Sequence, residues 1–131
     1  KEVKYNSNLI ENLDRVIADN KIDLIYTHWL GDVHQDHSAI GRATLNAARH
    51  TPRVLMYRSN WYKSVEPFDG DFFVDISDYL DIKVASIRAH ESECERRGEQ
   101  WITFVKNQNR TRGIEIGVDY AEDFKLVKWL V

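Results

Sequence analysis

The sequence predicts an α/β fold built on a mostly parallel sheet. Three short apolar runs, at residues 24–27, 54–57 and 72–76, are bounded by segments with helical spacing. The first run is continuous rather than alternating, as is typical of a strand buried on both faces of a parallel sheet. A strand, a helix and a second strand in this order predict a right-handed βαβ unit.

Apolar spacing and boundary residues define the other predicted elements. Asn6 or Ser7 can cap the first helix, and Pro52 follows the second helix closely, a common stop. Gly98 is expected to separate the last two helices. The predicted helices cover residues 7–21, 37–49, 77–97 and 100–111, and an edge strand is predicted over residues 124–131.

Composition and charge limit the classes of function. The 131 residues are 43% hydrophobic and 30% charged, which predicts one globular domain over residues 1–131. A net charge of -3 argues against a nucleic acid partner. No apolar run approaches the roughly 18 residues of a membrane span. Cys94 is the single cysteine, which excludes an intrachain disulfide and suits a reducing compartment, so we expect a cytoplasmic protein.

A histidine-rich segment follows the first predicted strand. Residues 27–37 read T-H-W-L-G-D-V-H-Q-D-H, and they hold three of the five histidines. His34, Asp36 and His37 form an H-x-D-H cluster where a loop meets a helix. Neutral imidazole is a good zinc ligand, and a neighbouring carboxylate can fix its tautomer. A chance cluster in which Asp36 only caps the helix is the alternative, because a zinc site normally needs three protein ligands.

The surroundings of this cluster resemble the PIG-L/LmbE-like family of zinc-dependent N-acetylglucosamine deacetylases. The similar pieces are the strand ending in T-H-W, the Gly31-Asp32 turn, H-x-D-H, the Ala/Arg-rich helix after it and Tyr57 at a strand end. Downstream come F-V-D-I-S at residues 73–77 and R-G-x-x-x-G-x-x-Y-A-E-x-F at residues 112–124. The pieces occur in family order and cover nearly the whole chain, so together they are more specific than any one alone.

The resemblance implies a three-layer Rossmann-like sheet and hydrolytic N-deacetylation of an N-acetyl amino sugar or its conjugate. In this family the first strand ends in an A-H-P-D-D-E motif, which supplies two zinc ligands and the general base. That motif is absent here. The resemblance therefore implies the C-terminal part of the fold, with the N-terminal strands missing. We expect Zn²⁺ in the complete fold, and weak or no zinc binding by this chain alone.

Position in the motif implies a role for each residue. His37 is expected to bind the metal, His34 to stabilise or protonate the reacting centre, and Asp36 to act as their partner. Weaker substrate-binding expectations fall on Trp29 and Trp61, by stacking on a sugar, and on Arg58, through an anionic group. Packing and solvated surface are the alternatives for these three residues.

Two further expectations concern partners and the alternative function. A sheet that lacks strands exposes an unpaired edge, so we expect self-association or binding of a missing N-terminal segment. The alternative function is a non-catalytic remnant, a binding or assembly module with the same fold and no metal site. A nucleotide-binding domain is disfavoured, because neither G-x-G-x-x-G nor G-x-x-x-x-G-K-[ST] is present.

Overall fold

The structure is a computed structural model that describes residues 2–131. Along the chain, the helices and strands are α1 (Ser7–Asp19), β1 (Leu24–His28), α2 (Gln35–Ala47), β2 (Arg53–Tyr57), β3 (Phe72–Asp75), α3 (Leu80–Arg88), α4 (Glu91–Arg97), α5 (Glu99–Ile116) and β4 (Ala121–Trp129). Short 3₁₀ turns follow α2 and precede α3, at Ala48–His50 and Ser77–Tyr79. The chain divides into two compact units, and the boundaries fall after Phe72 and after Asp123. One domain over residues 1–131 stays a prediction.

The four strands form one mixed sheet in the order β1-β2-β4-β3. β1 and β2 are parallel, with Leu24 opposite Arg53 and His28 opposite Tyr57, whereas β4 runs antiparallel to β2. These strands and the five α-helices confirm the predicted α/β fold, with a sheet that is mostly but not entirely parallel.

The prediction of a final edge strand is wrong. β4 lies between β2 and β3 in the sheet. Its first half is buried at Ala121 and Asp123, while Leu126 and Val127 in its second half are exposed. The second half of β4 is exposed, so its residues alternate loosely between polar and apolar, as in an edge strand. This alternation led to the wrong prediction of the position of β4 in the sheet.

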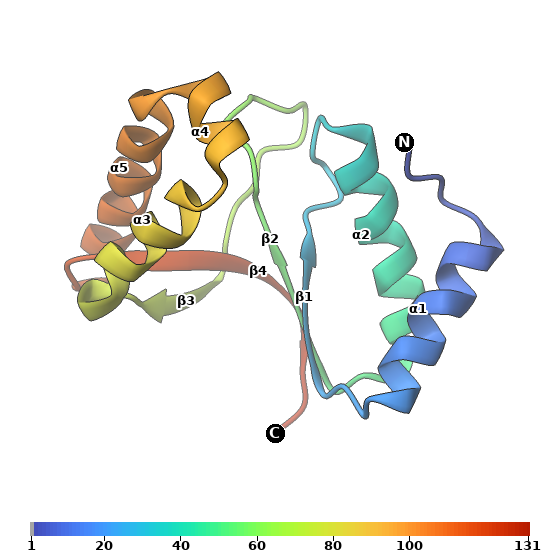
Figure 1. Cartoon of the computed structure of the whole chain (residues 1–131). Coiled ribbons are helices and arrows are strands. Elements are labelled where there is room, and N and C mark those ends of the chain that lie inside the picture. Colours follow the sequence, from blue (N-terminus) through green and yellow to red (C-terminus); the bar gives the residue numbers. More distant parts are fainter. Residues whose placement is uncertain (1) are drawn as a thin grey trace. The chain divides into compact units, whose positions relative to one another are not determined.

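Two helices cover β1 and β2 in the first unit. α1 begins where the Asn6 side chain accepts the N–H of Leu9 at 2.9 Å, as the sequence predicted. α1 packs along α2, and α2 packs along β1 (Figure 1). Val54, Leu55 and Met56 of β2 are each no more than 2% exposed, so β2 forms the centre of this core.

Gly41 lies where α2 passes closest to the end of β1. A Cβ at this position would lie 2.5 Å from the carbonyl oxygen of His28. We predict that Gly41→Ala forces the helix and strand apart and lowers the free energy of unfolding by about 1–3 kcal/mol, the usual cost of overpacking. Urea denaturation measures this, with Asn46→Ala on the exposed face of α2 as control. Helix propensity alone would make alanine stabilising at this position. A more stable Gly41→Ala protein would therefore show that the close approach to the His28 carbonyl does not limit the residue at position 41.

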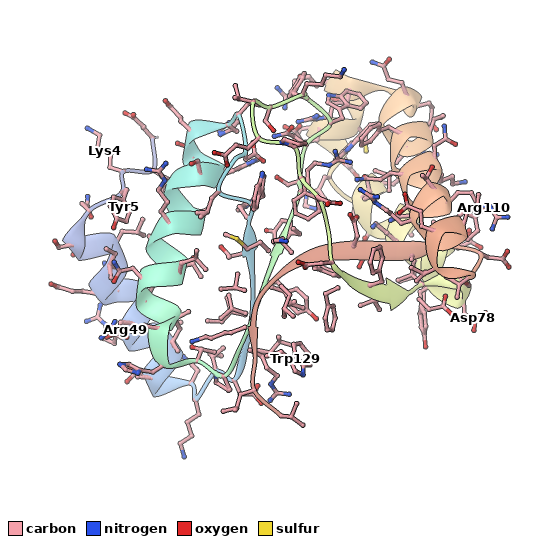
Figure 2. All side chains as sticks on the ribbon, turned by 180° about the vertical axis from the view of Figure 1, so that it is seen from behind. Lys4, Tyr5, Arg49, Asp78, Arg110 and Trp129 are labelled. Carbon is pink, nitrogen blue, oxygen red and sulfur yellow. The ribbon has the colours of Figure 1, made fainter. Side chains whose placement is uncertain are left out.

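The second unit holds the other three helices. The helix predicted over residues 77–97 is interrupted at Ala89 and His90, between α3 and α4. Residues 80–97 contain no glycine or proline, so no helix-breaking residue marks the interruption. α5 packs beside the start of β4, where the Asn109 side chain donates to the carbonyl of Ala121 at 2.8 Å. Figure 2 shows Arg110 on α5; its guanidinium donates to the carbonyl of Asp119 at 2.7 Å. Within residues 2–131, no helix is long and apolar enough to cross a membrane.

Candidate metal and catalytic site

The candidate site lies at the carboxyl ends of β1 and β2, where parallel α/β sheets usually bind ligands. His28 is the last residue of β1, and its register partner Tyr57 is the last residue of β2. The histidine-rich loop runs from His28 into α2. The predicted position of the cluster, at the carboxyl edge of the sheet, is confirmed.

The second helix starts earlier than predicted, and its cap is a histidine. α2 begins at Gln35 rather than His37. The Nδ1 atom of His34 accepts the backbone N–H of Asp36 at 3.2 Å. His34 is therefore the N-cap, so the alternative in which Asp36 caps the helix is wrong. Histidine is not among the residues preferred at this position, which is why the boundary was misread.

Three imidazole rings stack at this edge. The centroids of His34 and His37 lie 4.4 Å apart, with ring planes inclined by 21°. The ring of His28 also stacks on that of His37, with centroids 4.2 Å apart and ring planes inclined by 6°. The predicted convergence of His34 and His37 is confirmed. The contribution of His28 was missed, because it reads as the end of a strand.

A buried carboxylate holds His37, and it belongs to Asp32. The Asp32 side chain is 1% exposed, and its Oδ2 lies 3.0 Å from Nδ1 of His37. Its Oδ1 accepts the backbone N–H of His34 at 2.8 Å and the side-chain amide of Asn60. With the proton of His37 on Nδ1 and facing this carboxylate, Nε2 is the nitrogen left for a metal.

Asp36 has a different partner from the one expected. One carboxylate oxygen of Asp36 accepts the backbone N–H of Val3 at 3.0 Å. The carboxylate placed against His37 is that of Asp32, which the sequence reading treated only as part of a turn. The role of Asp36 as a partner of the histidines stays a prediction.

His28 is engaged at both of its nitrogens. Nδ1 lies 3.2 Å from Oγ of Ser59, and Nε2 lies 3.3 Å from the hydroxyl of Tyr57. Oγ of Ser59 also lies 3.0 Å from Nδ1 of His37, so one hydroxyl joins both rings.

Burial lowers the pKa of His28, and the neighbouring His37 lowers it further. Burial also raises the pKa of Tyr57. Both groups are thus held in their neutral forms.

The lowered pKa of His28 predicts a loss of stability in mild acid. Below its ordinary pKa of 6.5, the unfolded chain takes up a proton that the folded chain resists. The contribution is fully present above about pH 6.5 and is lost as the pH falls towards the lower folded pKa. We predict that the free energy of unfolding falls more between about pH 7.5 and pH 5.5 in the natural protein than in His28→Gln. Urea denaturation at the two pH values measures it; an equal fall in both proteins would contradict the assignment.

The donor set suits zinc. His28, Asp32 and His37 each offer one ligand atom, and these atoms lie within 4.8 Å of one another. Imidazole nitrogen and carboxylate oxygen are common zinc ligands. However, the facing atoms of Asp32 and His37 already bond each other, so this arrangement equally fits a carboxylate that orients a metal-binding histidine.

The three residues expected to bind substrate fall into two places. The ring of Trp29 packs edge-on against Phe68, with centroids 5.6 Å apart, and its indole N–H is buried with no hydrogen-bond partner among residues 2–131. Arg58 and Trp61 line a cavity of about 340 Å³ after β2. Substrate binding by these residues stays a prediction.

Curated deacetylases are similar in sequence, although no protein-family model matches the chain. A "Probable N-acetyl-alpha-D-glucosaminyl L-malate deacetylase 2" of Bacillus subtilis is 29% identical over 100 residues, covering 72% of this chain and 45% of that protein. The "Uncharacterized deacetylase YaiS" of Escherichia coli is 31% identical over 82 residues, 60% of this chain and 42% of that protein. Both relatives are named deacetylases, which is consistent with the PIG-L/LmbE-like family. The chain spans just under half the length of these curated relatives.

Solved structures show the same fold. The conserved protein TT1542 from Thermus thermophilus superposes with a TM-score of 0.81 at 24% identity, over 98% of this chain and 62% of that one. The N,N'-diacetylchitobiose deacetylase from Pyrococcus horikoshii gives 0.80 at 20% identity, over 96% and 53%. GalB, a 4-carboxy-2-hydroxymuconate hydratase, gives 0.67 at 17% identity, over 96% and 60%. Because a hydratase shares the LmbE-like fold, the fold alone does not set the reaction.

Proposed function

We propose that this chain supplies the histidine half of a zinc-dependent deacetylase. The reaction would be hydrolysis of the acetamide of an N-acetyl amino sugar or its conjugate, with water, to acetate and a free amine. The observation that carries the proposal is His37, stacked at 4.4 Å on His34 and held through Nδ1 by the buried Asp32. The deacetylase relatives support the choice of reaction.

In this proposal His37 holds the zinc through Nε2, and the other ligands come from a segment outside these 131 residues. Bound zinc supplies a Lewis acid that polarises an amide carbonyl and lowers the pKa of water to about 7. Asp32 keeps the His37 proton on Nδ1, so the lone pair on Nε2 faces away from the carboxylate. The rings of His28 and His34, both stacked on that of His37, help to fix its plane.

His34 has one nitrogen available to the substrate. Its Nδ1 accepts the N–H of Asp36, so in the neutral ring the proton resides on Nε2. That N–H can donate to the negative charge that develops on the acetyl oxygen. Protonating Nδ1 would break the helix cap. The capping bond therefore favours oxyanion stabilisation by His34 over proton donation to the leaving amine.

The test uses the complete gene product beside the 131-residue chain. Zinc is measured by elemental analysis, and acetate release is followed with N-acetylglucosamine and N-acetylglucosamine conjugates. We expect stoichiometric zinc and acetate release from the complete protein, with little of either from the chain alone. A complete protein that binds no zinc and releases no acetate would favour the alternative, a binding or assembly module.

We predict that His34→Ala in the complete protein leaves zinc bound and lowers turnover by about 10²–10³-fold, the scale for one oxyanion donor. His34→Asn is the matched control, because asparagine is a good N-cap but lacks the ring N–H. It should restore the stability of α2 without restoring turnover. If His34→Asn is fully active, the role of His34 is capping alone.

A further inference from the structure

Ser59 lies where the segment after β2 passes the end of β1. The backbone N–H of Trp29 donates to the carbonyl of Tyr57 at 2.9 Å, so the pairing of the two strands continues one residue beyond β1. Three side chains of the site then surround Oγ of Ser59: Nδ1 of His28 at 3.2 Å, Nδ1 of His37 at 3.0 Å and Oδ2 of Asp32 at 3.4 Å. One hydroxyl group, with a single proton, therefore serves three polar neighbours.

The carboxylate of Asp32 decides which way this hydroxyl points. Asp32 is 1% exposed in its side chain, and a carboxylate has about four acceptor sites. Its Oδ1 accepts the backbone N–H of His34 and the side-chain amide of Asn60, and its Oδ2 accepts the N–H of His37. The Ser59 proton fills the fourth site; turned elsewhere, it would leave two oxygen atoms facing each other without a hydrogen. Because hydrogen bonds to a charged acceptor are the stronger ones, Ser59 donates to Asp32.

The direction of this bond fixes the proton of His28. With its own proton on Asp32, the Ser59 hydroxyl can only accept from the two rings, and its two lone pairs suffice for both. His28 must therefore carry its proton on Nδ1 and accept at Nε2. The hydroxyl of Tyr57 lies 3.3 Å from this Nε2 and keeps its proton, since burial raises the pKa of Tyr57. A chain of hydrogen bonds thus runs in one direction, from Tyr57 through His28 and Ser59 to Asp32.

We propose that Ser59 is a positioning residue of the site, one that sets the tautomers of His28 and His37 together. The inference rests on the proposed function, in which His37 binds zinc through Nε2. Ser59 gives the Nδ1 proton of His37 a second acceptor beside Asp32. It also closes His28 to a metal, because Nδ1 of that ring is protonated and Nε2 accepts from Tyr57. Of these two stacked rings, His37 alone is left with a free nitrogen.

The first experiment reads the tautomers in the 131-residue chain, without metal or substrate. Long-range proton–nitrogen NMR spectra are recorded at about pH 7.5, where the ring of His28 is neutral because its pKa lies below the ordinary 6.5. We expect both His28 and His37 to be protonated at Nδ1. In Ser59→Ala, His28 should show averaged shifts of two tautomers, since the Tyr57 hydroxyl can donate or accept. Ser59→Thr keeps the hydroxyl and should restore the natural shifts.

Two results of this experiment would overturn the inference. One is a His28 ring protonated at Nε2 in the natural protein, and the other is a His28 ring whose shifts do not change in Ser59→Ala. Ser86→Ala is the control, because Ser86 is an exposed serine of α3 that donates to the carbonyl of Lys83. It should leave both rings unchanged.

Tyr57→Phe shows which end of the chain sets the direction. The variant removes the donor at Nε2 of His28 but leaves Ser59 bonded to Asp32. We expect His28 to keep its proton on Nδ1, while its Nε2 signal moves to that of a nitrogen without a hydrogen bond. Tyr62→Phe, at an exposed tyrosine of the same segment, should change neither signal. A His28 ring that changes tautomer in Tyr57→Phe would mean that Tyr57 sets the direction, against the inference.

The complete protein separates this inference from the proposed function. Ser59→Ala should lower zinc affinity roughly 3-fold to 10-fold, the scale of one hydrogen bond, with KM for the N-acetyl sugar unchanged. Ser59→Thr should restore the affinity, which is measured by competition with a chelator. Acetate release with the same zinc affinity in Ser59→Ala would overturn the inference and leave the function standing. Tautomers that change as expected in a protein that never releases acetate would do the reverse.

Discussion

Replacing His37 with alanine in the complete protein is expected to abolish tight zinc binding and with it the release of acetate. In the proposed site His37 is the metal ligand from this chain, and its ring is fixed by Asp32 and by two stacked imidazoles. Losing only the partner behind a metal-binding histidine costs about 10–100-fold in metal affinity. Losing the ligand itself should cost more than that.

His50→Ala is the control, because His50 is an exposed histidine in the turn after α2. Elemental analysis after dialysis, beside acetate release, measures both effects. Zinc retained at full stoichiometry in His37→Ala would show that the ligand is assigned wrongly. Variants that lose activity but keep both zinc and fold would instead point to a catalytic role for His37.

The isolated chain offers a second test of the same ligand. His28, Asp32 and His37 could hold a metal among themselves, and the resemblance predicts weak or no zinc here. Stoichiometric zinc in the 131-residue chain that disappears in His28→Ala would establish a three-ligand site within this chain. Zinc binding that does not change in His28→Ala would leave His28 as a residue that orients the ring of His37.

The elements with strong local signals were predictable from sequence. The cap at Asn6, the parallel pair β1 and β2, and the cluster at the strand ends follow from side-chain spacing and boundary residues, which act over a few positions. The order of the sheet did not follow, because the place of β4 depends on pairing with strands far away in the chain. Its exposed end, at Leu126 and Val127, carried the misleading pattern.

The histidine pair was predictable, but its supporting contacts were not. His28 and Asp32 are functional candidates because of contacts with the segment that follows β2. Tyr57 and Ser59 contact His28, and Ser59 and Asn60 contact Asp32. These partners are separated by 27 to 31 residues in the sequence. No local pattern encodes a partner at that separation. The local signal for the site was the presence of three histidines within ten residues, with Asp32 between His28 and His34. Asp36 was predicted as the partner because it stands beside His37 in the H-x-D-H motif.

Asp32→Asn is expected to have the second largest effect, and it separates the two carboxylates of this loop. Asparagine keeps the shape of the side chain but turns one acceptor into an N–H₂ donor. The fixed backbone N–H of His34 will retain the oxygen, so the new donor faces Nδ1 of His37. His37 must then accept at Nδ1 and carry its proton on Nε2, the nitrogen proposed for zinc.

We therefore predict that Asp32→Asn lowers zinc affinity by about 10–100-fold and the free energy of unfolding by about 1–3 kcal/mol. Nitrogen chemical shifts of the His37 ring report the change of tautomer in the 131-residue chain, independently of metal. Asp36→Asn is the matched control: its carboxylate meets Val3 rather than a histidine, so the tautomer and the zinc should persist. If Asp36→Asn has the larger effect on zinc or turnover, then Asp36 is the partner of the histidines, as the resemblance implied, and Asp32 serves the fold.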